Sequence, residues 1–148
     1  MPASLTRRTL IAATLCLTAA SGVGAGAEVL RLPPGAPERR AILDALRVPV
    51  AAAIGGRIEF AVNELRVLDD WAYVAATPRR PGGRPIDWSR TRYAAAMRAD
   101  AMSDLTLGLL RRDGGRWRVV VHAIGPTDVA WIEWIDRYGA PKRVFADE

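Results

Sequence analysis

The sequence predicts an α+β domain in which an N-terminal helix packs on a curved antiparallel sheet of two hairpins, with a C-terminal helix at the end. Three observations predict this class. Apolar residues recur at helical spacing over residues 37–54 and again over residues 129–138. Between these ranges lie two pairs of segments in which apolar and polar residues alternate. A leading helix followed by antiparallel hairpins is an α+β arrangement.

Residues 1–27 are expected to be a cleavable signal peptide. Arg7 and Arg8 precede an apolar run at residues 9–17, which is shorter than the about 20 residues that span a bilayer. A small-x-small pattern at residues 25–27 is typical of a signal peptidase site. The arginine pair also resembles a twin-arginine export signal, although the ordinary Sec route is the favoured interpretation. The protein is therefore expected to be exported, either periplasmic or secreted.

The remainder divides into a short linker at residues 28–36 and a single domain at residues 37–148. Cys16 is the only cysteine, so without the signal the domain has no disulfide and no thiol nucleophile. The net charge of +5 includes Arg7 and Arg8, and the remaining +3 is interleaved with acids. We therefore expect no nucleic-acid partner. No second apolar run is long enough for an integral membrane span.

The leading helix has a signal at each end. Pro37 suits its first turn and Glu38 favours its positive end, whereas the glycines at positions 55 and 56 end it. Pro49 interrupts the hydrogen-bond ladder, so a kink or a restart is expected there.

The first hairpin is predicted by a period of two. Apolar residues occupy even positions from 58 to 62 and odd positions at 65 and 67, so we expect either a bulge near residues 63–64 or a strand buried on both faces. Aspartates at 69 and 70 form the turn before the strand at 71–76. Residues 77–87 contain three prolines and are expected to be irregular. A weak helical pattern follows over residues 89–102.

The second hairpin joins residues 105–109 to residues 117–124 through the turn at residues 113–115, Asp-Gly-Gly. A glycine and a proline then stop the strand. Thr127 or Asp128 is expected to cap the last helix, which Gly139 ends.

These features resemble the NTF2-like and cystatin-like domains. The leading helix, the long hairpin and residues 113–120, with their pattern of turn, Gly, x, Trp, x, hydrophobic, carry the resemblance, which covers residues 37–124. Residues 79–88 and 125–131 also resemble blocks shared by small uncharacterised bacterial exported proteins. The NTF2-like fold hosts enzymes, binding modules and adaptors, so the resemblance implies a fold without choosing an activity.

His122, the only histidine, is the candidate acid or base. Asp87 and Asp128 are the carboxylates that would pair with it in an enzyme. The structural alternatives are a sheet histidine and a helix-capping aspartate. One histidine without cysteine makes a metal site unexpected. No cofactor is expected, since the glycine pairs lack the spacing of a phosphate loop.

A second candidate site is a binding surface. Tryptophan and arginine are enriched in binding hot spots, and two tryptophans each lie beside a Pro/Gly loop and an aspartate. The residues of this surface are Arg84, Asp87, Trp88, Asp128 and Trp131. If both loops meet at one end of the sheet, they suit a protein or an anionic ligand. The structural alternative is a rigid loop braced against the last helix.

We therefore hypothesise a non-catalytic binding domain of the periplasm whose ligand is an unidentified protein or small molecule. One alternative is a small NTF2-like enzyme of isomerase, dehydratase or hydrolase type that uses His122 and an aspartate. The other is a structural envelope protein that forms a homodimer through the open sheet face.

Overall fold

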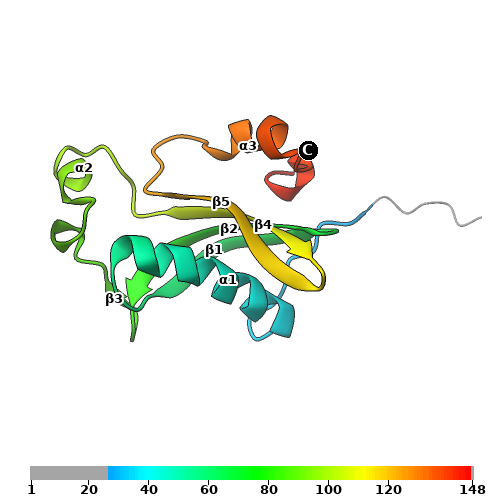
Figure 1. Cartoon of the computed structure of the whole chain (residues 1–148), viewed down its shortest axis with the longest axis horizontal. Coiled ribbons are helices and arrows are strands. Elements are labelled where there is room, and N and C mark those ends of the chain that lie inside the picture. The colour runs from blue at the N-terminus through cyan, green and yellow to red at the C-terminus, as the bar shows by residue number, and fades with distance from the viewer. Residues whose placement is uncertain (1–26, 148) are drawn as a thin grey trace, which may run out of the picture.

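The computed structural model describes residues 27–147, so all but the last residue of the predicted signal peptide lies outside it. Within this range the chain forms three α-helices and an antiparallel sheet of five strands, which confirms the predicted α+β class (Figure 1). In chain order the elements are α1 (Pro37–Ile54), β1 (Glu59–Leu68), β2 (Trp71–Arg80), β3 (Arg84–Pro85), the 3-10 helix η1 (Trp88–Arg90), α2 (Ala94–Arg98), β4 (Thr106–Asp113), β5 (Arg116–Ile124), α3 (Trp131–Tyr138) and the 3-10 helix η2 (Lys142–Val144).

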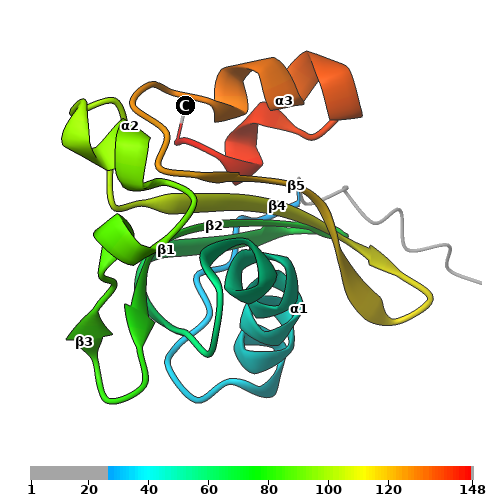
Figure 2. The ribbon, with the colours of Figure 1, turned by 60° about the vertical axis from the view of Figure 1, so that its left-hand side comes forward.

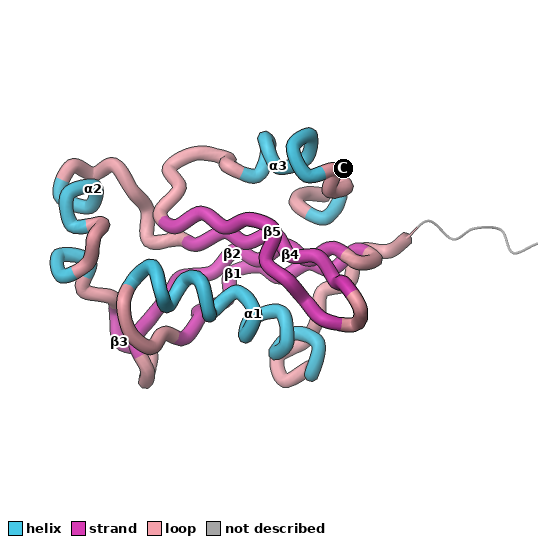
Figure 3. The backbone as a smooth tube through the Cα atoms, in the orientation of Figure 1, coloured by secondary structure: helices cyan, strands magenta, loops and turns pink. Residues whose placement is uncertain are grey.

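The sheet has helices on both faces (Figure 2). Its strands follow the order β1-β2-β4-β5, and β3 pairs with the end of β2. Helix α1 packs on one face, whereas α3 and the C-terminal segment after it pack on the other. The long connection from β2 to β4 carries η1 and α2 and lies beyond one end of the sheet (Figure 3).

Helix α1 packs through one stripe of residues spaced four apart. Ile42, Leu46, Val50 and Ile54 are all buried against the sheet. Of the kink or restart predicted at Pro49, the restart is wrong, because the helix continues through this residue. The buried stripe on both sides of the proline holds the two halves on the sheet. The helix ends as predicted at Gly55, which has a φ of 85°.

The bulge in the first hairpin is confirmed. The register of β1 against β2 shifts between Val62 and Glu64, and this shift brings Leu65 to the same face as Val62, towards α1. Both predicted hairpin turns are also present. A second bulge, between Leu109 and Leu110 where β4 pairs with β5, was not expected.

The prediction of irregular structure over residues 77–87 is wrong, because β2 continues to Arg80 and β3 turns back on it. Strand β2 tolerates Pro78 for a positional reason. The backbone of Val67 bonds outward to Leu30, away from β2, and Ala72 is its partner on β2. The backbone nitrogen of Ala72 therefore points away from β1. Because this direction alternates along a strand, the nitrogen of Pro78 also points away from β1. On that side, the pairing with β4 extends only as far as Ala76, so no ladder hydrogen bond is lost. The weak helix expected at residues 89–102 is only η1 and α2.

The sheet face opposite α1 is covered rather than open. Trp134, Val144 and Phe145 are buried there against Tyr73 and Leu109. In the described chain, the face that the structural-protein hypothesis assigned to a dimer is therefore covered by α3 and the C-terminal segment over Tyr73 and Leu109.

The residues before and within α3 correct the predicted cap. Helix α3 begins at Trp131 after an Ala130 cap, and no side chain caps it. Asp128 instead lies exposed in a bend, so the prediction that Thr127 or Asp128 caps this helix is wrong. The apolar side chain of Trp131 fixes the start of the helix by stacking on Phe145, with ring centroids 5.4 Å apart.

The segment predicted as a linker, residues 28–36, is tied to the domain. Leu30 and Val67 exchange two backbone hydrogen bonds of 2.8 and 2.9 Å. Arg39 of α1 donates to the Leu32 carbonyl at 3.0 Å. The segment therefore adds one bridge to the outer edge of β1.

Candidate functional site

His122 lies on the edge strand β5, opposite Gly108 of β4. Gly108 faces Leu46 of α1, and cross-strand partners share a face, so His122 faces the α1 side of the sheet. It is half-buried. Burial, and secondarily the positive charge of Arg92, lower the pKa of its imidazole. Within residues 27–147 it forms no ion pair or side-chain hydrogen bond with Asp87 or Asp128.

The lowered pKa of His122 makes a prediction about stability against pH. The unfolded chain takes up the proton near the usual pKa of about 6.5, while the folded chain resists it, so folding loses stability as the pH falls from about 7 towards 5. The His122→Gln variant lacks this loss. We expect urea unfolding to show that the free energy of unfolding of the wild type falls relative to that of the variant as the pH is lowered. If the wild type instead gains stability relative to the variant as the pH is lowered, the prediction is wrong, and His122 has a carboxylate partner, as the enzyme alternative requires.

The two tryptophans of the predicted binding surface lie on different faces of the sheet. Trp88 packs against the α1 side and meets Tyr93 edge to face, with centroids 5.9 Å apart. Trp131 packs in the opposite cluster, on Phe145. The structure therefore does not unite Arg84, Asp87 and Trp88 with Asp128 and Trp131 on one surface. For Trp131 the geometry agrees with the bracing alternative.

Arg84 and Asp87 do come together, in a cleft where the β2–β3 turn meets the end of α1. The cleft has a volume of about 710 Å³ and is lined by Ile54, Gly55, Arg80, Arg84, Pro85, Asp87 and Arg90. The turn forms because glycines at 82 and 83 both take positive φ, 79° and 76°, and this places Arg80 opposite Arg84.

The arginines of this cleft keep most of their donors free. The Nη1 atom of Arg80 donates to the carbonyl oxygens of Gly55 at 2.7 Å and Arg57 at 3.3 Å, which are exposed acceptors just beyond α1. Arg84 makes only a long bond, 3.4 Å, from Nε to the Pro81 oxygen. Arg90 has no side-chain hydrogen bond to any residue in the range 27–147. Among those same residues, none of the three forms an ion pair.

Asp87, the one carboxylate of the cleft, is engaged with its own backbone turn. It accepts from the Ser89 amide at 3.2 Å and from the Ser89 hydroxyl at 2.5 Å, and so starts η1. It pairs with neither Arg84 nor Arg90 within 4 Å. The cleft thus holds three cations against one occupied carboxylate, which favours an anionic ligand.

Arg80 and Arg90 were not predicted to belong to this site. Both lie close in sequence to Arg84 and Asp87, within residues 79–90, so their sequence positions are a local indication that they belong to the site. The sequence positions do not show that the end of β2 lies beside the end of α1, which brings Arg80 to Gly55, 25 residues away.

No protein-family model, curated protein or solved structure matches the chain. None of the helices within residues 27–147 is long and apolar enough to cross a membrane. In that same range, no three His, Cys, Asp or Glu side chains gather where they would hold a metal ion.

Proposed function

We propose that this chain is an exported, non-catalytic binding domain of the periplasm that takes a ligand bearing a carboxylate or phosphate in the cleft of Arg80, Arg84 and Arg90. One observation carries the proposal: three guanidinium groups line one hollow without a carboxylate partner among the described residues. Arginine binds such anions through paired N–H donors. Export rests on the N-terminal pattern of residues 1–27.

We further propose that the architecture is NTF2-like or cystatin-like. The support is the leading helix that lies across an antiparallel meander, β1-β2-β4-β5. In this proposal α3 and the C-terminal segment are an addition that covers the second face.

Anion binding is tested by calorimetric titration with inorganic phosphate and with citrate, at low and at high salt. The double variant Arg84→Gln, Arg90→Gln removes two guanidinium groups whose only side-chain hydrogen bond within the described chain is the long, exposed one from Arg84 to Pro81. It should therefore keep its stability and lose at least about tenfold in affinity, the loss expected for charged hydrogen bonds. Added salt should weaken wild-type binding.

Arg118→Gln is the matched control. Arg118 lies on β5 and its side chain is 67% exposed, so this change removes one positive charge away from the cleft. It should bind both anions as the wild type does. If the control loses as much affinity as the double variant, or if neither anion binds the wild type, the proposed function is wrong.

A further inference from the structure

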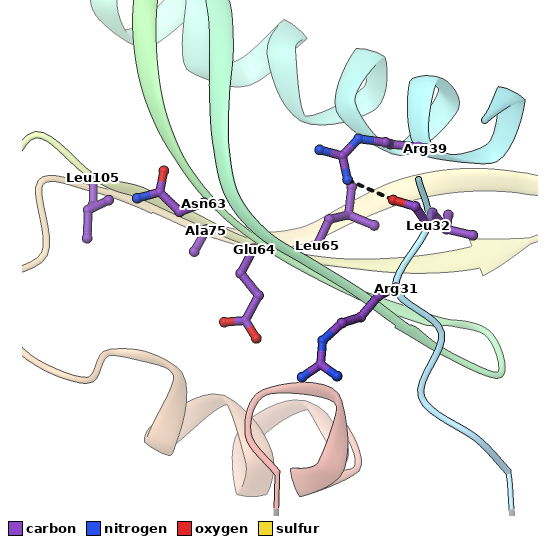
Figure 4. Close-up of a pocket in the computed structure, with 8 residues that line it drawn as sticks. All are labelled: Arg31, Leu32, Arg39, Asn63, Glu64, Leu65, Ala75 and Leu105. Carbon is purple, nitrogen blue, oxygen red and sulfur yellow. Dashed lines mark hydrogen bonds between the residues drawn. The ribbon is translucent and has the colours of Figure 1, made fainter. Parts of the chain in front are cut away.

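The outer edge of β1 has no backbone partner at residues 59–62 within the described chain. Strand β1 ends the order of the sheet, and its outer side is bridged only by Leu30, at Val67, within the described chain. Beyond the bulge, the chain's own segment runs beside this edge: Leu32 packs on the core there, and Arg39 donates to the Leu32 carbonyl. A hollow of about 440 Å³ remains between this segment and the strand (Figure 4). Residues 59–62, before the bulge, have no backbone pairing on their outer side within the described chain, and residues 34–36 lie across a hollow from Phe60 and Val62.

Two adjoining hollows lie between this uncovered stretch and α1. One, of about 350 Å³, is lined by Arg40, Leu43, Phe60 and Val62 among others. The next, of about 550 Å³, reaches Arg57 and Glu59, and both hollows share Asp44 and Arg47. Together they form a groove that runs along the strand edge.

The backbone of the uncovered stretch is oriented for pairing. Val67 bonds outward to Leu30, and Ala72 lies opposite it on β2. Alternation along β2 then places the backbone groups of Phe60 and Val62 outward as well. Both side chains pack towards α1. The backbone groups of Phe60 and Val62 would bond to residues directly opposite them on an added antiparallel strand. The side chains of those residues would also face α1, because cross-strand partners share a face of the sheet.

The charge of the groove selects the partner. Arg40 and Arg57 have no side-chain hydrogen bond or ion pair to any residue of 27–147, and Arg47, which pairs with Asp44, also lies over the Phe60 ring at 5.9 Å. Four arginines, at 39, 40, 47 and 57, line the groove against the two carboxylates of Asp44 and Glu59, so its net charge is positive. A second copy of this chain added edge to edge would bring two such positive grooves together, and like charges repel. An acidic segment meets them favourably.

We propose that the β1 edge at Glu59–Val62 binds an extended acidic peptide segment of another protein by antiparallel strand addition. The main chain supplies the hydrogen bonds, as it already does for Leu30. Acidic side chains on the α1 side contact the arginines, and apolar stems fill the space beside Phe60 and Leu43. The groove shares no lining residue with the cleft of Arg80, Arg84 and Arg90, although the two adjoin where Arg80 donates to the Arg57 carbonyl.

The test uses labelled octapeptides and fluorescence anisotropy with the full domain. A peptide of alternating glutamate and valine should bind, and one of alternating lysine and valine should bind at least tenfold more weakly. Strand addition with glutamate facing α1 places the glutamate amides against β1. Methylation of the glutamate amide nitrogens should therefore abolish binding, while methylation of the valine amide nitrogens should leave it unchanged.

Protein variants complete the experiment. Arg40→Glu with Arg57→Glu should weaken the acidic peptide at least tenfold, whereas Arg118→Glu and the cleft pair Arg84→Gln, Arg90→Gln should not. The proposal is overturned if the acidic peptide does not bind, if both methylated peptides bind alike, or if sedimentation shows that the groove closes by self-association. Loss of binding in the cleft pair alone would also overturn it and would assign the peptide to the cleft.

Discussion

Replacing Phe145 with alanine is expected to lower the free energy of unfolding by about 3–5 kcal/mol. Phe145 is 3% exposed. Its ring lies 5.3 Å from that of Tyr73, 5.4 Å from Trp131 and 6.5 Å from Trp134. The ring therefore joins α3 and the C-terminal segment to the sheet, and its loss leaves a cavity that three rigid rings cannot close. Urea unfolding followed by tryptophan fluorescence measures the change.

Tyr73 gives a local readout of the same substitution. Burial is the main cause that raises its pKa to about 12, Glu64 adds to this rise, and Arg66 opposes it. Because Phe145 covers Tyr73, the Phe145→Ala variant should bring this pKa back towards the usual value of about 10. Alkaline titration by ultraviolet absorbance follows the phenolate.

Ile132→Ala is the control for this face. Ile132 lies on α3 and is 55% exposed, so its truncation should change stability by no more than about 0.5 kcal/mol. If Phe145→Ala behaved like this control and left the Tyr73 pKa unchanged, the C-terminal segment would not cover the sheet in solution.

Local features of the fold were predicted because their causes are local. The change of parity between Val62 and Leu65 indicated either a bulge or a strand buried on both faces, and the register shift between Val62 and Glu64 shows the bulge. Gly139 ends α3 in a left-handed conformation, with φ of 67°, which costs glycine little. Turn residues and strand periodicity act within a few residues, so the sequence alone shows them.

The failed predictions depend on neighbours that are distant in sequence. Pro78 reads as a strand breaker, yet its position is harmless because the pairing of β4 with β2 stops at Ala76. Asp128 has the chemistry of a cap, but the stacking of Trp131 on Phe145, 14 residues later, sets where α3 begins. No local pattern contains either fact.

The candidate site shows the same division. Arg84 and Asp87, which were predicted to share a binding surface, line one hollow. Trp88 and Trp131 were expected on one surface, but Trp88 packs on the α1 side of the sheet and Trp131 packs on the opposite side. The free edge of β1 was not predicted, because a strand's place in the sheet order is set by topology rather than by its residues.

Leu46→Ala and Gly108→Ala are expected to destabilise the domain separately and to compensate each other. Leu46 is fully buried, so its truncation should cost about 2–5 kcal/mol. A Cβ at position 108 would lie 2.7 and 2.9 Å from the two Cδ atoms of Leu46, and such overpacking should cost about 1–3 kcal/mol. In the double variant the new methyl group enters the space that Leu46 leaves. The combined loss should then fall short of the sum by at least about 1 kcal/mol.

Pairing Gly108→Ala with Phe145→Ala supplies the contrast for this cycle. Gly108 meets α1 on one face of the sheet, and Phe145 packs in the cluster on the other face, so these two losses should add to within about 0.5 kcal/mol. Urea unfolding of the three single and two double variants, with an unchanged m-value, gives both coupling energies. Compensation with Leu46 but not with Phe145 would show that Gly108 is required by the close approach of α1. Strict additivity in both pairs would mean instead that Leu46 does not lie over Gly108, and α1 would then cross the sheet elsewhere.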